Sequence, residues 1–369
     1  MMTQKITMVL SAALLGALVI PSTASAQSVA KFYEGKDIKL LVGSGAGGGY
    51  DTYARALARH MGKYIPGKPN IVVQNMPGAG GTVMMNHLAN RAQKDGSVIG
   101  AAFGQSLIEP ALDKGKVTKF DSRTVNWIGN TSGQVSACFT WKASSKVKTI
   151  EDARKTATIM SATGSSNPSA IYANIFNMLM GTKFKVVTGY TTPESTLAIE
   201  RGEADGSCLA YETLVARKPT WATGPLSNHK VNWLAVVDDK ESPNLPGIPP
   251  VTKYLDNKDD KTVIKVLRRQ LLMGRPYVAP PGVPADRLAA IRTAYLATMK
   301  DPGFLAEARK LKMFVDPSDH KAMEKVVADT YAIPAAVINK VNETIATAKL
   351  NAKTLSTRWK GAKKKKKKK

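Results

Sequence analysis

Two glycine-rich turns constrain this chain more than any other feature, because each follows a β-rich run and precedes a helix-patterned run. The first turn, residues 43–49 (GSGAGGG), follows the run 38–42, and the second, residues 77–81 (PGAGG), follows the run 71–75. Glycine tolerates positive φ and has no side chain, so such turns can point N–H groups inward. A helix N-terminus adds unpaired donors and a partial positive charge. Two such turns on neighbouring strands predict an anion pocket, which would work mainly through backbone donors because neither turn contains lysine or arginine.

The N-terminus has the pattern of an export signal. Lys5 supplies a positive charge, residues 6–20 are apolar, and Ala24-Ser25-Ala26 matches a cleavage site. The apolar run is shorter than the roughly 20 residues that a membrane-spanning helix needs, so cleavage is favoured over an uncleaved anchor. We therefore predict a signal peptide, residues 1–26, and a soluble mature chain in the periplasm.

The chain is strongly basic, with 53 Lys and Arg against 28 Asp and Glu. Residues 363–369 are consecutive lysines, and such a block repels itself and does not fold alone. We expect residues 351–369 to be a disordered basic tail; the alternative is a contact with anionic lipid or an acidic partner. Basic residues exceed acidic ones without this tail as well, which fits acidic small molecules or an anionic membrane face. Nucleic acid is not expected as a partner, because the predicted location is outside the cytoplasm and no nucleic-acid motif is present.

The chain has two cysteines, Cys138 and Cys208. In an oxidising compartment an even number of cysteines favours a disulfide. The alternative is two separately buried thiols, since cysteine packs well in a core.

The length of the mature chain predicts two domains, because one core of ordinary size does not hold so many residues. Strand and helix patterns alternate through residues 38–103, which predicts a parallel sheet with helices on its faces. A second α/β block begins near residue 135, and beyond a proline-rich break the chain is mostly helical. The predicted parts are the first part of domain 1, domain 2, and a helical return to domain 1: residues 27–134, 135–244 and 245–350.

The second block repeats the helix-start chemistry of the first. Residues 163–168 and 190–194 each offer capping side chains followed by a proline in the first helical turn. Ligands of open α/β sheets bind beyond the carboxyl ends of the strands. Two domains that face each other with such edges would form a cleft.

Other readings of the glycine turns are less consistent with the chain. Residues 43–48 match G-x-G-x-x-G, but the second strand ends in Gln74-Asn75 rather than in the acid that would hold a ribose. No Gly-Lys-Ser/Thr of a P-loop follows either turn, and no G-x-S-x-G elbow surrounds Ser44. The four histidines lack metal-ligand spacing, so we predict no metal. Because these motifs are missing, we also predict no cofactor and no enzymatic activity. Two rivals stay open: an exported α/β enzyme acting on an acidic small molecule through Ser44 or Asp51, and a basic interaction protein.

Several segments, in order along the chain, resemble the tripartite tricarboxylate transporter receptors, also called Bug proteins. Residues 41–51 resemble their first signature loop and residues 74–81 their second. Residues 188–192 with 201–206 resemble a segment of their second domain, and residues 242–249 their proline-rich return. The resemblance covers nearly all of the mature chain. It implies an α/β periplasmic binding protein of the two-domain flytrap type (type II), a monomer that closes on a small organic carboxylate and delivers it to membrane permease subunits.

The resemblance also implies the residues that bind the ligand. In the family the two loops hold one carboxylate through backbone N–H groups and bridging water, and the second domain closes over it. The first loop here departs from the commoner Pro-Phe-x-Pro-Gly-Gly form, which leaves the size and identity of the carboxylate open. The predicted ligand-binding residues are Ser44, Gly45, Ala46, Gly47, Gly48, Gly49, Tyr50, Asp51, Pro77, Gly78, Ala79, Gly80, Gly81, Gln105, Thr163, Ser165, Ser166, Asn167, Tyr190, Thr191 and Asp205.

Overall fold

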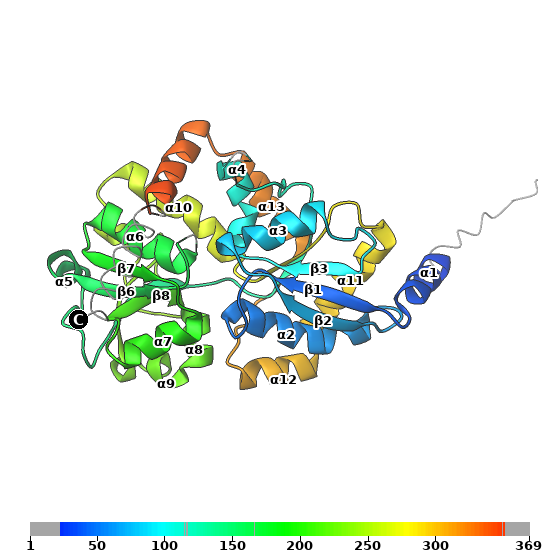
Figure 1. The fold of residues 1–369 in the computed structure, drawn as a ribbon, viewed down its shortest axis with the longest axis horizontal. Coiled ribbons are helices and arrows are strands. Elements are labelled where there is room, and N and C mark those ends of the chain that lie inside the picture. Colours follow the sequence, from blue (N-terminus) through cyan, green and yellow to red (C-terminus); the bar gives the residue numbers. More distant parts are fainter. Residues whose placement is uncertain (1–22, 114, 116, 166, 349, 351–369) are drawn as a thin grey trace, which may run out of the picture.

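The computed structural model describes residues 23–113, 115, 117–165, 167–348 and 350, and it shows two α/β lobes, each with its own sheet (Figure 1). The first 22 residues of the predicted signal peptide, Ser166 and the predicted basic tail lie outside the described residues. We call the lobe with the six-stranded sheet lobe 1 and the lobe with the five-stranded sheet lobe 2. Within the described part of the chain, no helix has both the length and the apolar character needed to cross a membrane.

Lobe 1 combines the N-terminal third of the chain with segments that return from the C-terminal third. Its strands, in the order β11-β4-β10-β3-β1-β2 across the sheet, are β1 (Asp37–Val42), β2 (Asn70–Asn75), β3 (Val98–Ala101), β4 (Asn126–Asn130), β10 (Pro276–Ala279) and β11 (Ser318–Asp319). Its helices are α1 (Thr23–Tyr33), α2 (Gly49–Met61), α3 (Thr82–Asn90), α4 (Glu109–Asp113), α11 (Ala285–Thr298), α12 (Pro302–Lys310) and α13 (His320–Tyr331), with short 3₁₀ turns η1 (Gly62–Tyr64), η2 (Ala79–Gly81) and η3 (Gly104–Leu107).

Lobe 2 is the central part of the chain. Its strands, in the order β7-β6-β8-β5-β9, are β5 (Ser136–Trp141), β6 (Thr158–Ala162), β7 (Phe184–Thr188), β8 (Gly206–Ala210) and β9 (Val231–Val236). Its helices are α5 (Ile150–Lys155), α6 (Pro168–Met180), α7 (Thr192–Glu200), α8 (Tyr211–Arg217) and α9 (Pro219–Ala222), with the 3₁₀ turn η4 (Leu226–Asn228). The 3₁₀ turn η5 (Val251–Tyr254) and α10 (Lys258–Leu272) then lead back to lobe 1, and a further helical stretch covers residues 335–348.

The sheets are mixed rather than wholly parallel. Strand β1 pairs in parallel with β2 and β3, as predicted, but β10 runs antiparallel between β3 and β4. The prediction that the chain beyond residue 250 is mostly helical therefore missed a central strand. In lobe 2, β6 pairs in parallel with β7 and β8, whereas β5 is antiparallel to β8 and β9.

The register of the parallel pairs brings the predicted loops together. Val42 lies opposite Asn75, so the two glycine-rich turns leave the ends of adjacent strands at one edge of the lobe 1 sheet. Ala162 lies opposite Thr188 in the same way, so the turns before α6 and α7 start side by side in lobe 2. The carboxyl ends of parallel strands meet at one sheet edge, which is where α/β proteins build their sites.

The core continues from one lobe to the other. One buried cluster contains Trp127 of lobe 1, Phe176 of lobe 2 and Leu267 of α10. The Gln270 side chain of α10 donates to the Tyr172 hydroxyl of α6 at 2.7 Å. At the N-terminus, α1 runs past Ala26, and its Tyr33, which follows the predicted cleavage position, is buried and donates to the Gly96 carbonyl at 3.1 Å.

Two segments cross between the lobes, residues 131–135 and residues 271–275, and they run side by side. The N–H of Thr131 donates to the carbonyl of Arg275, that of Gly274 to Ser132, and that of Gln134 to Leu271, at 3.1, 3.1 and 2.7 Å. The approach is close at Gly274, where a Cβ would lie 2.5 Å from the Gln134 Cβ and 2.9 Å from the Gln134 nitrogen. These two segments, which we call the crossing segments, connect the lobes and are bonded to each other.

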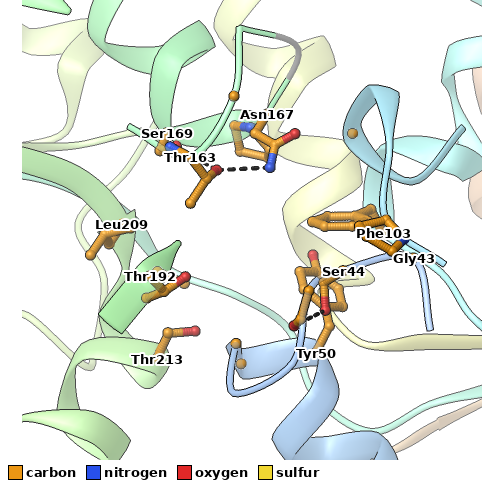
Figure 2. Close-up of a pocket in the computed structure, with 18 of the residues that line it drawn as sticks. Gly43, Ser44, Tyr50, Phe103, Thr163, Asn167, Ser169, Thr192, Leu209 and Thr213 are labelled. Carbon is orange, nitrogen blue, oxygen red and sulfur yellow. Dashed lines mark hydrogen bonds between the residues drawn. The ribbon is translucent and has the colours of Figure 1, made fainter. Parts of the chain in front are cut away.

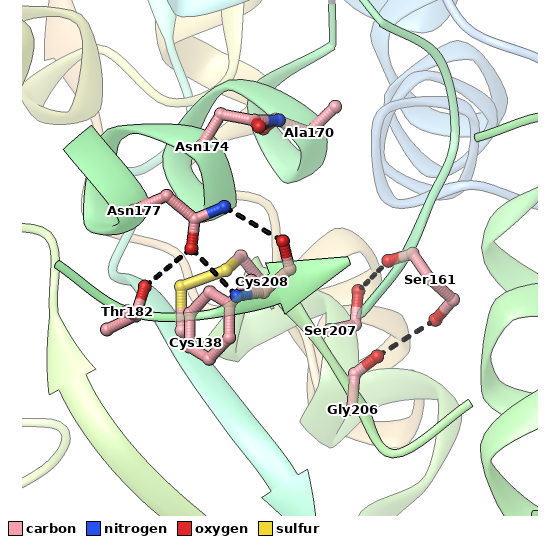
Figure 3. The surroundings of a disulfide bond; sticks show 10 residues. Cys138, Ser161, Ala170, Asn174, Asn177, Thr182, Gly206, Ser207 and Cys208 are labelled. Carbon is pink, nitrogen blue, oxygen red and sulfur yellow. Dashed lines mark hydrogen bonds between the residues drawn. A yellow bond between two sulfur atoms is a disulfide. The ribbon is translucent and has the colours of Figure 1, made fainter. Parts of the chain in front are cut away.

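Cys138 and Cys208 lie directly opposite each other on β5 and β8 and form a disulfide (Figure 3). Both are buried in the lobe 2 sheet. Next to them the Ser207 hydroxyl donates to the Ser161 carbonyl at 2.6 Å, which adds a side-chain link between β8 and β6. The bond joins residues 70 positions apart, so it closes a large loop of lobe 2.

Candidate ligand-binding site

A cavity of about 430 Å³ lies between the lobes, and Figure 2 shows side chains of both lobes facing it. Lobe 1 contributes both glycine-rich turns and Phe103, and lobe 2 contributes the starts of α6, α7 and α8. The predicted site residues that line the cavity are Ser44, Gly45, Ala46, Gly48, Gly49, Tyr50, Pro77, Gly78, Ala79, Gly80, Thr163, Asn167, Tyr190 and Thr191. The volume is in the range of small-molecule sites.

Hydrogen bonds of the Asp51 carboxylate stabilise the first glycine-rich turn. Its carboxylate accepts from the Gly47 N–H at 2.8 Å, from Asn75 Nδ2 at 2.8 Å and from Arg55 Nε at 3.0 Å. Asn75 Nδ2 also donates to the Ser44 carbonyl at 2.9 Å. Burial acts to raise the pKa of Asp51, but these hydrogen bonds outweigh it and hold the pKa below its ordinary value. Asp51 therefore supports the turn, and its oxygens are directed to the protein rather than to the cavity.

The second turn is shaped by positive φ angles at Gly78, Gly80 and Gly81. A Cβ at Gly81 would lie 2.5 Å from the Phe103 ring, so only glycine allows this approach. The Gln105 side chain, which is buried, donates to the Gly80 carbonyl at 2.9 Å. Gln105 and Gly81 therefore stabilise the conformation of the second turn, and neither residue lines the cavity.

Both turns carry backbone donors with no acceptor. Within the described part of the chain, no hydrogen bond is formed by the N–H groups of Ser44, Gly45 and Ala46 in the first turn, or of Gly78, Ala79 and Gly80 in the second. The first turn also leads into the N-terminus of α2, whose partial positive charge adds to these donors. Such an arrangement suits a negatively charged oxygen.

Lobe 2 presents hydroxyl and amide groups to the same cavity. Asn167 Nδ2 donates to Thr163 Oγ1 at 2.7 Å, and Ser169 Oγ accepts from the Thr163 N–H at 3.1 Å (Figure 2). Thr191 caps α7 in a capping box with Glu194. The side chain of Asn167 stands at the N-cap of α6 without a capping bond, and both Asn167 and Thr191 belong to the polar part of the cavity wall.

Three further predicted residues lie outside the cavity lining, and a fourth falls outside the described residues. Ser165 is described but lies outside the cavity lining, and Ser166 is not among the described residues. Gly47 lies behind the turn, where its carbonyl accepts from the Arg217 side chain of α8. Asp205 does not line the cavity either. The first residue of β8, Gly206, lies opposite Met160 in the middle of β6, so Asp205 lies beside the early part of that strand, and its carboxylate accepts from the Ile159 N–H at 2.7 Å. We predicted a contact between Asp205 and the ligand, but in this structure its carboxylate makes a bond within the lobe 2 sheet.

The sequence reasoning missed the charged residue of the cavity, Arg275. It follows α10 on one crossing segment, and it is the one charged residue among the described residues that line the cavity. Its guanidinium group lies over the rings of Tyr50 and Tyr53, with its carbon 4.4 and 4.9 Å from the ring centres. The prediction that the pocket works mainly through backbone donors rested on the two turns and did not include this side chain. The only local signal was a basic residue directly before the short apolar run 276–279.

Thirteen other residues line the cavity that the sequence reasoning did not select. They are Gly43, Phe103, Gln134, Ser136, Gly164, Pro168, Ser169, Tyr172, Thr192, Cys208, Leu209, Ala210 and Thr213. The neighbouring Glu212 is buried, and burial raises its pKa to about 7 although the charge of Arg275 acts to lower it. Among the described residues no group of three or more His, Cys, Asp or Glu side chains is placed to hold a metal ion.

Comparison with known proteins decides the family. Residues 53–343 match the family described as tripartite tricarboxylate transporter family receptor. This chain belongs to that receptor family. A curated relative, the UPF0065 protein in the gbd 5′ region of Cupriavidus necator, is 24% identical over 340 residues, which cover 89% of this chain and 93% of the relative.

Solved structures of low sequence identity share the two-lobed fold of this receptor. The periplasmic binding protein BugD is 20% identical with a TM-score of 0.64, covering 86% of this chain and 98% of its own. MatC from Rhodopseudomonas palustris, solved with bound malate, is 17% identical with a TM-score of 0.62, covering 85% and 99%. The receptor is thus a two-domain periplasmic binding protein in fold.

Proposed function

We propose that this receptor captures a small organic carboxylate in the cavity between its lobes and delivers it to the permease subunits of a tripartite transporter. The observation that carries the proposal is the pair of glycine-rich turns at adjacent strand ends, whose six N–H groups have no acceptor among the described residues. Hydrogen bonds from such groups to a carboxylate are charge-assisted and strong. The malate bound by MatC, a fold relative, is an acid of this class.

The proposal includes where and how the receptor works. The predicted signal peptide directs it to the periplasm, where it acts as a monomer without cofactor and without catalysis. The ligand bridges the two lobes, and their closure about the crossing segments reports occupancy to the permease. The rival is an exported enzyme, but Ser44 offers no nucleophile–base pair, since its hydroxyl donates to the Gly45 carbonyl at 3.3 Å.

A thermal-shift screen of the mature protein tests the carboxylate. The panel contains malate, succinate, citrate, glutamate and benzoate. A ligand at 100 times its dissociation constant adds about 2.7 kcal/mol to the folded state, which raises the melting temperature clearly. Gly80→Val should abolish the response because a branched side chain is strained at the positive φ of this residue. Absence of a response to every acid contradicts the proposal.

Two further measurements separate the receptor from its rivals. Mass spectrometry of a bound acid before and after incubation shows an unchanged compound if the protein is a receptor, and a product would establish an enzyme. Uptake of the same acid, labelled, by the source organism should fall when the gene is deleted and return with the intact gene. A chain without residues 351–369 should bind the acid unchanged, which would leave the basic tail out of the cavity.

A further inference from the structure

Helix α8 is the part of lobe 2 that reaches the first glycine-rich turn of lobe 1, and it lies on the side of lobe 2 that faces α2 (Figure 1). Thr213 and Arg217 are four residues apart on α8, so they lie on one face of the helix. The Arg217 guanidinium group donates through Nη1 to the Gly47 carbonyl of the turn. Thr213 lies against Gly49, where α2 begins. These two contacts join the lobes outside the crossing segments.

The approach of α8 to α2 leaves no room for a side chain between them. A Cβ at Gly49 would lie 2.3 Å from Thr213 Oγ1 and 3.3 Å from the Thr213 Cβ. The φ of Gly49 is not positive, so the neighbouring lobe, and not the backbone conformation, excludes a side chain here. The Thr213 hydroxyl also accepts from Arg275 Nη2 at 3.1 Å, which limits its rotation. The contact between α8 and the turn therefore forms only when the lobes lie as close as they do in this structure.

Arg217 brings a cation to this contact without an acid to pair with it. Among the described residues it forms no ion pair, and its Nε is buried without an acceptor. Glu200 at the end of α7 pairs with Lys218 at 2.8 Å. Asp51, which accepts from the N–H of the turn, pairs with Arg55 at 3.0 Å. Burial lowers the pKa of Arg217, but arginine stays charged at neutral pH.

The first turn is also where the proposed function places an anionic group of the ligand. Ser44, Gly45 and Ala46 carry N–H groups with no acceptor within the described part of the chain, and Gly47 is the next residue. An anion on these N–H groups and the Arg217 cation on the Gly47 carbonyl thus bind to the same short turn. Partly buried charges are screened little by salt, so they attract each other across it. Burying a charge costs free energy unless an opposite charge is near, and the anion offsets this cost.

We propose that Arg217 is an interlobe latch, whose cation bonds to the first turn when an anionic group is bound there and so couples closure of the lobes to occupancy of the site. The inference rests on the proposed function, which supplies both the anion and the movement of the lobes. Arg217 does not line the cavity, so it is a positioning residue that acts through the Gly47 carbonyl. In the receptor without ligand the cation has no anion to offset its burial, so the lobes lie further apart.

Melting temperatures and affinities with and without an acid test this coupling. The probe is the acid among malate, succinate, citrate, glutamate and benzoate that raises the melting temperature of the native protein most. Arg217→Gln should leave the melting temperature without acid unchanged or higher, because it removes a partly buried cation. It should weaken binding of the probe by about 5-fold or more, the lower end of coupling between sites, mostly through faster dissociation. A residue that only supports the fold would instead lower the melting temperature equally with and without the probe.

Two further variants and a measurement of shape complete the test. Arg201→Gln removes an exposed cation directly after α7, in the same lobe, and should leave the affinity unchanged. Arg217→Lys keeps the charge and can still donate to one carbonyl, so it should restore part of the affinity. In small-angle X-ray scattering the probe should reduce the radius of gyration of the native protein and of Arg201→Gln, and reduce that of Arg217→Gln less.

The outcomes separate this inference from the proposed function. If Arg217→Gln binds the probe as tightly as the native protein, or if the probe does not compact the native protein, the latch is overturned while the carboxylate receptor stands. If no acid of the panel binds, the proposed function fails and the inference with it. Should Arg217→Gln not fold, Gly49→Ala tests the same contact, because its Cβ would hold α8 away from α2. At a saturating concentration of the probe this variant should be less compact than the native protein, and equal compaction would overturn the latch.

Discussion

The crossing segments make a sharp stability prediction, because their two glycines differ in the space around them. A Cβ at Gly274 would lie 2.5 Å from the Gln134 Cβ and 2.9 Å from the backbone of both Gln134 and Gly133. A Cβ at Gly133 would lie 3.5 and 3.6 Å from the Leu272 and Leu271 carbonyls, an ordinary contact. Neither glycine has a positive φ, so alanine suits both backbones. Only Gly274→Ala forces the segments apart.

The two substitutions should change the free energy of unfolding in opposite directions. Replacing glycine by alanine at a compatible position stabilises by about 0.4–1 kcal/mol through the unfolded chain, and this is the expected result for Gly133→Ala. Overpacking costs about 1–3 kcal/mol, and at Gly274 the opposing atoms belong largely to the backbone and cannot rotate away. Gly274→Ala should therefore lower the free energy of unfolding in urea by about 1–2 kcal/mol after the gain is subtracted. Equal stabilities of the two variants would refute the reasoning.

Three further predictions concern the lobes themselves. Replacing Cys138 and Cys208 together by alanine should cost about 4 kcal/mol in urea unfolding, because the disulfide closes a 70-residue separation; an unchanged midpoint would contradict this. Asp51→Asn should lower the free energy of unfolding by about 1–3 kcal/mol at pH 7, and the difference from the native protein should vanish as the pH falls through the depressed pKa of Asp51. Burial raises the pKa of Glu212 to about 7, so the stability that its protonated form contributes is fully present below about pH 4.5 and is lost as the pH rises to 7. Glu212→Gln should remove this decrease in stability with rising pH, as measured by urea unfolding at pH 5 and pH 8.

Local patterns were enough to predict the glycine-rich side of the site. Each turn follows a short apolar strand directly, so its position in a parallel sheet depends on neighbours in sequence, and the pairing of Val42 with Asn75 places both turns together. The helix starts at Asn167, which stands at the N-cap of α6, and at Thr191, whose side chain caps α7, are local signals for the same reason. The cavity wall in lobe 2 follows from them.

The floor of the cavity could not be predicted in this way, because it depends on contacts between distant segments. Arg275 reaches the cavity because the strand that follows it, β10, enters the sheet antiparallel between β3 and β4. A strand of four residues bounded by prolines has no clear hydrophobic periodicity, so the sequence does not predict it. The position of Asp205 depends on the register of β8 against β6, which shows which end of the sheet it occupies and which the sequence does not reveal. Asp51 and Gln105, predicted to bind the ligand, lie beside the turns, and the direction of their side chains depends on Asn75 and Gly80.

The disulfide has a consequence for when the receptor matures. Cys208 belongs to the cavity wall, and its bond to Cys138 ties together the two strands behind that wall. A reducing compartment keeps cysteine thiols reduced, so the disulfide forms only after export to an oxidising compartment. A newly made chain inside the cell, where small acids are abundant, therefore has a wall that is not yet covalently closed. In a receptor exported as proposed, assembly of the site is completed on the side of the membrane where its ligand has to be collected.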